Sequence, residues 1–145
     1  MTSPTVFPDT EGALRTYLRG LTATRVDFAT PSSSAKCITL AEAGSAFDTG
    51  TPLENTLVTF SCWAAHDATA QTSGSKADAR ALRDWLVGVL FDLGTTGRVD
   101  IAVGGTTVRL LGSTVVSSQF APDLTTRPAT PRYVVDALVH AIALP

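Results

Sequence analysis

The chain has 145 residues, of which 44% are hydrophobic and 17% are charged, and its formal net charge is -2. This length and composition predict a single folded domain over residues 1–145 and exclude disorder along the whole chain. Because no run of basic residues occurs, we expect no sequence-specific nucleic-acid partner and no membrane partner.

The amino-terminal residues and the cysteines indicate where the protein is made. Met1 to Asp9 lack a basic segment followed by an apolar stretch, so we expect no secretory signal. Cys37 and Cys62 have neither a Cys-x-x-Cys pattern nor metal-site spacing, and each lies in a strand-like stretch. We therefore expect reduced, buried thiols in a soluble protein made in a reducing cytoplasm.

A first helix is predicted to follow Phe7-Pro8-Asp9-Thr10-Glu11, where Asp9 or Thr10 can cap the free backbone N–H groups. Apolar residues then recur with the i, i+3, i+4, i+7 spacing of one helix face, namely Leu14, Tyr17, Leu18 and Leu21. This spacing predicts one buried stripe on a helix with Gly20 in its last turn.

Two short strands and a long loop are predicted next. Arg25 to Thr30 alternates as a strand does and stops at Pro31, and Lys36 to Leu40 forms a second strand. Ala43 to Glu54 contains glycines, a proline and small polar residues. This composition predicts a long, mobile surface loop.

The clearest strand is Asn55 to Ala65, in which large side chains alternate between both faces. This alternation predicts a central strand with helices over one face. The clearest helix, Ser75 to Leu93, begins with the capping-box spacing of Ser75 and Asp78 and is predicted to stop at Gly94. Its predicted buried stripe is Ala79, Leu82, Leu86, Val89 or Leu90, and Leu93, whereas Arg80, Arg83 and Asp84 are expected on a solvated face.

The last third of the chain is predicted to be β structure. Arg98–Val103 and Thr107–Phe120 flank Gly104-Gly105, which predicts a hairpin. A proline-bearing loop, Ala121 to Pro131, precedes a long strand over Arg132 to Leu144. The order helix, strands, helix, strands predicts an α+β fold, a two-layer sandwich in which a mostly antiparallel β-sheet is covered by two main helices.

No group of residues in the sequence predicts catalysis. Cys62 stands four residues before His66, but a strand that runs into a loop does not bring the two side chains face to face. The other histidine, His140, alternates with apolar residues and is expected on a partly buried strand face. His66 and Asp67 have no third ligand at a suitable spacing. We therefore expect no enzyme, with no catalytic residues, no cofactor and no metal.

Three stretches occur in an order that is typical of one protein family. The first is Val6-Phe7-Pro8-Asp9, which leads into the helix with Leu14, Tyr17 and Leu18. The second is the strand from Leu57 to Ala64, which ends in Trp63-Ala64 and is followed by the Ala- and Leu-rich helix from Lys76 to Leu93. The third is Pro131-Arg132-Tyr133-Val134-Val135. Together they resemble the tail terminator family of long-tailed, siphovirus-type bacteriophages, particularly those of actinobacterial hosts. Many relatives carry an Arg-rich strand and a Gly-Gly pair where this chain has Lys36 to Leu40 and Gly44.

The resemblance implies a structural virion protein, made in the host cytoplasm, that forms a homo-hexameric ring at the head-proximal end of the phage tail. Such a ring stops polymerisation of the tail tube and provides the joining surface for the head–neck connector. The implied partners are other copies of the chain, the tail tube protein and the connector protein. Loops Ala43–Glu54, His66–Gly74 and Ala121–Pro131 are the candidate contacts, because loops on a rigid scaffold often carry binding.

Two rival interpretations stay open. The chain is alternatively another neck, head–tail connector or tail-completion protein of the same assembly. A small ligand-binding domain or enzyme of unrelated origin is the third possibility. A deep apolar pocket with converging polar groups would favour this last class, and a flat surface with apolar side patches would favour assembly.

Overall fold

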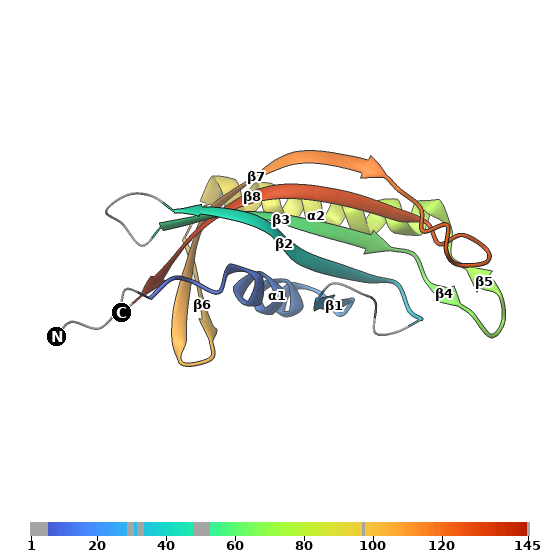
Figure 1. The fold of residues 1–145 in the computed structure, drawn as a ribbon, viewed down its shortest axis with the longest axis horizontal. Coiled ribbons are helices and arrows are strands. Elements are labelled where there is room, and N and C mark those ends of the chain that lie inside the picture. Colours follow the sequence, from blue (N-terminus) through green and yellow to red (C-terminus); the bar gives the residue numbers. More distant parts are fainter. Residues whose placement is uncertain (1–5, 29–30, 32–33, 48–52, 97, 145) are drawn as a thin grey trace.

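The computed structural model describes residues 6–28, 31, 34–47, 53–96 and 98–144, and its architecture is the predicted α+β fold. Within these residues, six strands form one curled sheet in the order β1-β2-β3-β8-β7-β6 (Figure 1). The strands are β1 (Arg25–Phe28), β2 (Cys37–Phe47), β3 (Leu53–Trp63), β6 (Val99–Val103), β7 (Thr106–Phe120) and β8 (Arg132–Leu144). β1 pairs in parallel with β2, and the other neighbouring strands are antiparallel.

The two helices and the inner face of the sheet share one hydrophobic core. α2 (Lys76–Thr96) packs along β7, β8 and β3, and α1 (Thr10–Leu21) lies within the curl of the sheet against β1, β2 and β6 (Figure 1). Phe60 of β3 is the largest fully buried side chain of this core. The predicted alternation of β3 is confirmed, since alternate residues from Val58 to Cys62 are buried, and the predicted strand β8 likewise buries alternate residues from Tyr133 to Ala141.

α1 begins where the sequence predicts, with Asp9 as its cap. The Asp9 carboxylate accepts a hydrogen bond from the Gly12 backbone N–H at 2.9 Å. Leu14 and Leu18 are fully buried, but the prediction for Leu21 is wrong, because its side chain is 50% exposed. The strand that follows α1 is the edge of the sheet, so no further strand in the described part of the chain lies beyond it to cover Leu21.

The predicted long loop at Ala43–Glu54 is also wrong over the residues that the structure describes. β2 continues to Phe47, and β3 already begins at Leu53. The two strands stay in register, with Phe47 opposite Glu54, and a bulge after Glu42 absorbs an extra residue. Backbone pairing needs no apolar side chains, and this half of β2 is exposed, so its sequence lacks the usual alternation. Residues 48–52 of the predicted loop lie outside the described residues, as do 29–30 of the first predicted strand.

The capping box of α2 is confirmed at its amino-terminal end. The Asp78 N–H donates to Ser75 Oγ at 3.1 Å, and the Ser75 N–H donates to the Asp78 carboxylate at 3.3 Å. The predicted stripe from Ala79 to Leu93 is buried. The stop at Gly94 is wrong, because the helix continues to Thr96. Gly94 instead allows α2 to approach β7, where a β-carbon at position 94 would lie 2.5 Å from the carbonyl oxygen of Ser113.

Arg83 does not lie on a fully solvated face as predicted. Its side chain is only 20% exposed, its guanidinium donates to Ser118 Oγ at 3.0 Å, and it stacks 4.7 Å from the ring centre of Tyr133. The long arginine side chain therefore covers the part of β7 and β8 that extends beyond the helix stripe. Arg80 and Asp84 are exposed as predicted.

Candidate functional site

Two of the three candidate loops meet at one end of the sheet. Residues 66–74 contain a small hairpin of β4 (His66–Asp67) and β5 (Thr72–Ser73). Ser73 Oγ is hydrogen-bonded to the His66 ring at 2.8 Å and donates to the Pro128 carbonyl at 3.3 Å, which joins the hairpin to the loop over residues 121–131. Figure 1 shows both segments side by side beyond the end of β3. The structure therefore combines two predicted loops into one surface.

The loop over residues 121–131 is held by its own hydrogen bonds. The backbones of Asp123 and Thr130 bond to each other in both directions, at 2.9 and 3.0 Å. The Asp123 carboxylate accepts from the Thr125 hydroxyl at 2.6 Å and from the Thr125 N–H at 2.9 Å. These donors stabilise the ionised form and lower the pKa of Asp123 below its ordinary value. The loop is thus a folded element that can present a defined surface.

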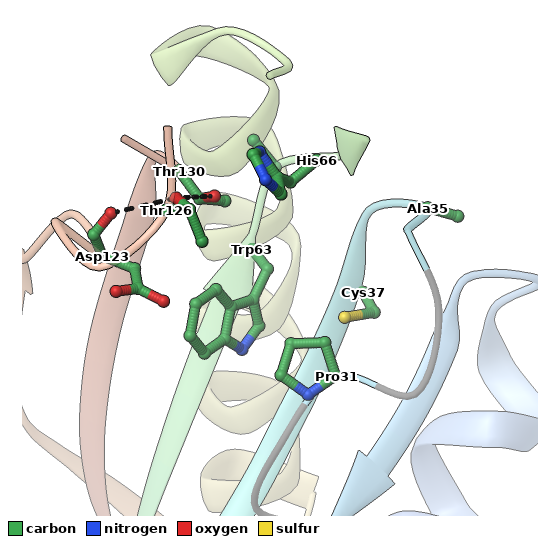
Figure 2. Close-up of a pocket in the computed structure, with 9 residues that line it drawn as sticks. Pro31, Ala35, Cys37, Trp63, His66, Asp123, Thr126 and Thr130 are labelled. Carbon is green, nitrogen blue, oxygen red and sulfur yellow. Dashed lines mark hydrogen bonds between the residues drawn. The ribbon is translucent and has the colours of Figure 1, made fainter. Parts of the chain in front are cut away.

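A hollow of about 220 Å³ lies between this loop, the start of β4 and the segment before β2. Its lining includes Pro31, Cys37, Trp63, His66 and Thr126, and Figure 2 shows the Trp63 indole at its centre, with Pro31 and Cys37 to one side and Asp123 and Thr126 to the other. Trp63 Nε1–H donates to Thr39 Oγ1 at 2.9 Å, so the indole is fixed.

Several polar groups around this hollow already have bonding partners, either in its lining or next to it. The hydroxyls of Thr126 and Thr130 lie 2.7 Å apart, and Arg132 stacks on the indole of Trp63 with 4.8 Å to the ring centre. Ligand pockets usually exceed about 300 Å³ and direct a few polar groups at the ligand. The hollow is smaller than this, so it has the character of a surface depression between loops.

The described residues of the third candidate segment, 43–47 and 53–54, lie toward the opposite end of β3. β3 runs from Leu53, next to that segment, to Trp63, next to the hollow. The outer face of the sheet connects the two ends and carries polar contacts, including Thr59 Oγ1 to the Asp136 carboxylate at 2.7 Å. The candidate segments therefore lie in two places, separated by the length of β3. No signal in the sequence pairs residues 66–74 with 121–131, because their contact is purely tertiary.

Cys62 lies in the hydrophobic core, whereas Cys37 and His66 both line the hollow. Cys62 is fully buried in the core, and burial raises its pKa to about 12. Burial likewise raises the pKa of Cys37 to about 11. His66 lines the hollow, so Cys62 and His66 do not form a nucleophile–base pair in the structure. His140 lies half-buried on the outer face of β8, where its Nδ1 bonds to the Asn55 side chain.

Over the residues that the structure describes, no group of three or more His, Cys, Asp or Glu side chains is arranged to hold a metal ion. Neither α1 nor α2, as described, is long and apolar enough to cross a membrane. Comparison of the chain with known protein families and with curated proteins gives no match.

Proposed function

We propose that this chain is a structural virion protein that caps the phage tail tube as a ring, ends tube polymerisation and offers the joining surface to the head–neck connector. The order of sequence stretches that resemble tail terminators is the basis of this proposal. Its proposed partners are further copies of the chain, the tail tube protein and the connector protein. Its proposed place is the head-proximal end of the tail.

The observation that supports this role best is the separation of two different ends along β3. A terminator has to contact the tube on one side and the neck on the other, and a ring subunit also needs two unlike lateral patches. The surface formed by residues 66–74 and 121–131 at one end, joined by the Ser73–Pro128 hydrogen bond, suits one axial contact. The opposite end, where β3 begins at Leu53, suits the other.

Two alternatives remain as rival proposals. A neck or tail-completion protein would use the same two ends, so the fold supports it equally. A small ligand-binding domain or enzyme has weaker support, because the hollow beside Trp63 holds about 220 Å³ and its threonine hydroxyls bond to each other. Under this proposal the chain has a structural role and is not an enzyme.

Electron microscopy of tails assembled without this protein tests the proposal. A terminator predicts tubes that grow beyond the normal length. Tails of normal length that fail to join heads would contradict termination and support a connector role. Tails that are normal in both respects would contradict both assembly roles.

A further inference from the structure

Exposed aromatic and acidic side chains gather at the amino-terminal end of α1. The rings of Phe7 and Phe47 meet at 4.6 Å in an edge-to-face contact, and their side chains are 44% and 54% exposed. Beside them the Glu11 carboxylate accepts a hydrogen bond from the Glu42 backbone N–H at 2.8 Å. We call Phe7, Asp9, Glu11, Glu42 and Phe47 the acidic end.

Over the residues that the structure describes, no ion pair neutralises the negative charge of the acidic end. None of the ion pairs among the described residues includes Glu11, Glu42 or Glu54. The pKa of Glu42 is raised by partial burial and by the nearby carboxylates of Glu54 and Glu11. A cation from another molecule would therefore be favoured here.

The carboxyl-terminal end of α1 has the opposite character. Three guanidinium groups surround the single carboxylate of Asp27, from Arg15 at 4.0 Å, Arg19 at 3.2 Å and Arg25 at 3.4 Å. Arg15 also stacks 4.5 Å from the ring centre of Phe28, which is 39% exposed. We call Arg15, Arg19, Arg25 and Phe28, together with the exposed Leu21, the basic end. Among the ion pairs of the described residues, three cations here share one anion.

The two ends lie about 18 Å apart along the twelve-residue helix α1, with β1 beside the basic end (Figure 1). Each combines exposed apolar side chains with charges of one sign, which is the composition of a protein interface with an apolar centre and a charged rim. Their signs are opposite, and the exposed rings of Phe7 and Phe47 are suitable faces for an arginine side chain. One chain thus carries both halves of a complementary contact.

We infer that the acidic end of one subunit binds the basic end of the next copy of this chain, so that α1 forms the head-to-tail contact of the assembly. Because the two patches differ, the contact is heterologous and can close into a ring. A second copy of this chain would cover both patches, whereas a different protein bound to one patch would leave the other patch exposed. This inference rests on the self-association in the proposed function, and it specifies the surface used.

Charge reversal tests the inference with purified protein in analytical ultracentrifugation at low ionic strength. Glu11→Lys with Glu42→Lys makes both ends basic, and Arg19→Glu with Arg25→Glu makes both ends acidic. Each variant alone is expected to lower self-association at least about 10-fold, because like charges then meet. A mixture of the two variants is expected to recover assembly, with the two chains alternating. Added salt is expected to weaken the wild-type contact.

Matched variants distinguish this interface from a general effect of charge. Arg80→Glu with Asp84→Arg exchanges an exposed ion pair on α2 and is expected to leave assembly unchanged. Circular dichroism reports whether each variant folds. If Arg19→Glu with Arg25→Glu fails to fold beside the Asp27 carboxylate, Arg19→Gln with Arg25→Gln replaces it, and weaker association is again expected.

The remaining outcomes contradict the inference in distinguishable ways. Wild-type oligomers that none of the reversals weakens would place the ring contact elsewhere and leave the proposed function standing. If the mixture of the two charge-reversal variants fails to assemble, the head-to-tail pairing is also overturned. A wild-type chain that stays monomeric from micromolar to millimolar concentration would overturn the contact itself. The length of tails made without the protein tests the proposed function independently.

Discussion

Gly94 in α2 lies so close to Ser113 in β7 that a β-carbon at position 94 would stand 2.5 Å from the Ser113 carbonyl oxygen. Gly94→Ala is therefore expected to force the helix from the sheet and to lower the free energy of unfolding by about 1–3 kcal/mol. Urea denaturation measures this change. Gly88 in the same helix has no atom within 4 Å of its virtual β-carbon. Gly88→Ala is the matched control and should be neutral or stabilising by about 0.5–1 kcal/mol.

The fully buried ring of Phe60 fills the core between β3 and the helices. Phe60→Ala is expected to cost about 3–5 kcal/mol, because it removes buried apolar surface and leaves a cavity. Phe91 in α2 is 68% exposed, so Phe91→Ala should change stability far less. Equal losses in thermal or chemical denaturation of the two variants would contradict this placement of Phe60.

The Asp78 N–H in the first turn of α2 donates to Ser75 Oγ at 3.1 Å and also to the Ser75 carbonyl oxygen at 3.1 Å, so the Ser75 side chain adds an acceptor where helix backbone donors lack full partners. Ser75→Ala is expected to destabilise the protein by about 1 kcal/mol. Ser75→Asp keeps a capping oxygen and should retain wild-type stability. A Ser75→Ala variant with an unchanged urea midpoint would show that the cap contributes nothing.

The ionised Asp123 carboxylate contributes stability through its bonds from Thr125. Because its folded pKa lies below the ordinary 3.8, this contribution is fully present above pH 3.8 and is lost as the pH falls through the lower folded value. Asp123→Asn should therefore lower the melting temperature at neutral pH, and the difference should close in acid. Thr125→Val removes the hydroxyl donor, and in that background the pH dependence of the Asp123→Asn difference should shrink.

Burial keeps both thiols protonated, with the pKa of Cys37 at about 11 and that of Cys62 at about 12. A shift from 9.0 to about 11 lowers the thiolate fraction at pH 8 about 100-fold. A disulfide reagent such as DTNB should thus label the native protein far more slowly than the protein in urea, where both thiols should react. Rapid labelling of the native state would show that the segment before β2 opens readily.

Local patterns in the sequence predict the elements whose side chains alternate between core and solvent. The capping residues Asp9 and Ser75, the alternation along β3 and β8, and the hairpin at Gly104-Gly105 all reflect interactions between near neighbours. The second half of β2 was predicted wrongly because its exposed residues pair only through the backbone with β3. The sequence predicts that Gly94 ends the helix. In the structure Gly94 instead allows close approach to Ser113 of β7, which is nineteen residues away.

The candidate surfaces were harder to predict than the fold. The bond from Ser73 to Pro128 joins residues 55 positions apart, so no spacing rule connects the two loops. The acidic and basic ends likewise form only when β1 and β2 return to opposite ends of α1, which brings Asp27 to Arg19 and Glu42 to Glu11. In the sequence these charges are scattered singly.

The position of β8 has a consequence for how the protein is made. β8 lies between β3 and β7 at the centre of the sheet, although the ribosome synthesises it after every other strand described. While it is still inside the ribosomal exit tunnel, β3 and β7 lack their shared neighbour, and the core cannot close. The core of this domain therefore closes only after β8 has emerged from the tunnel and paired with both neighbours.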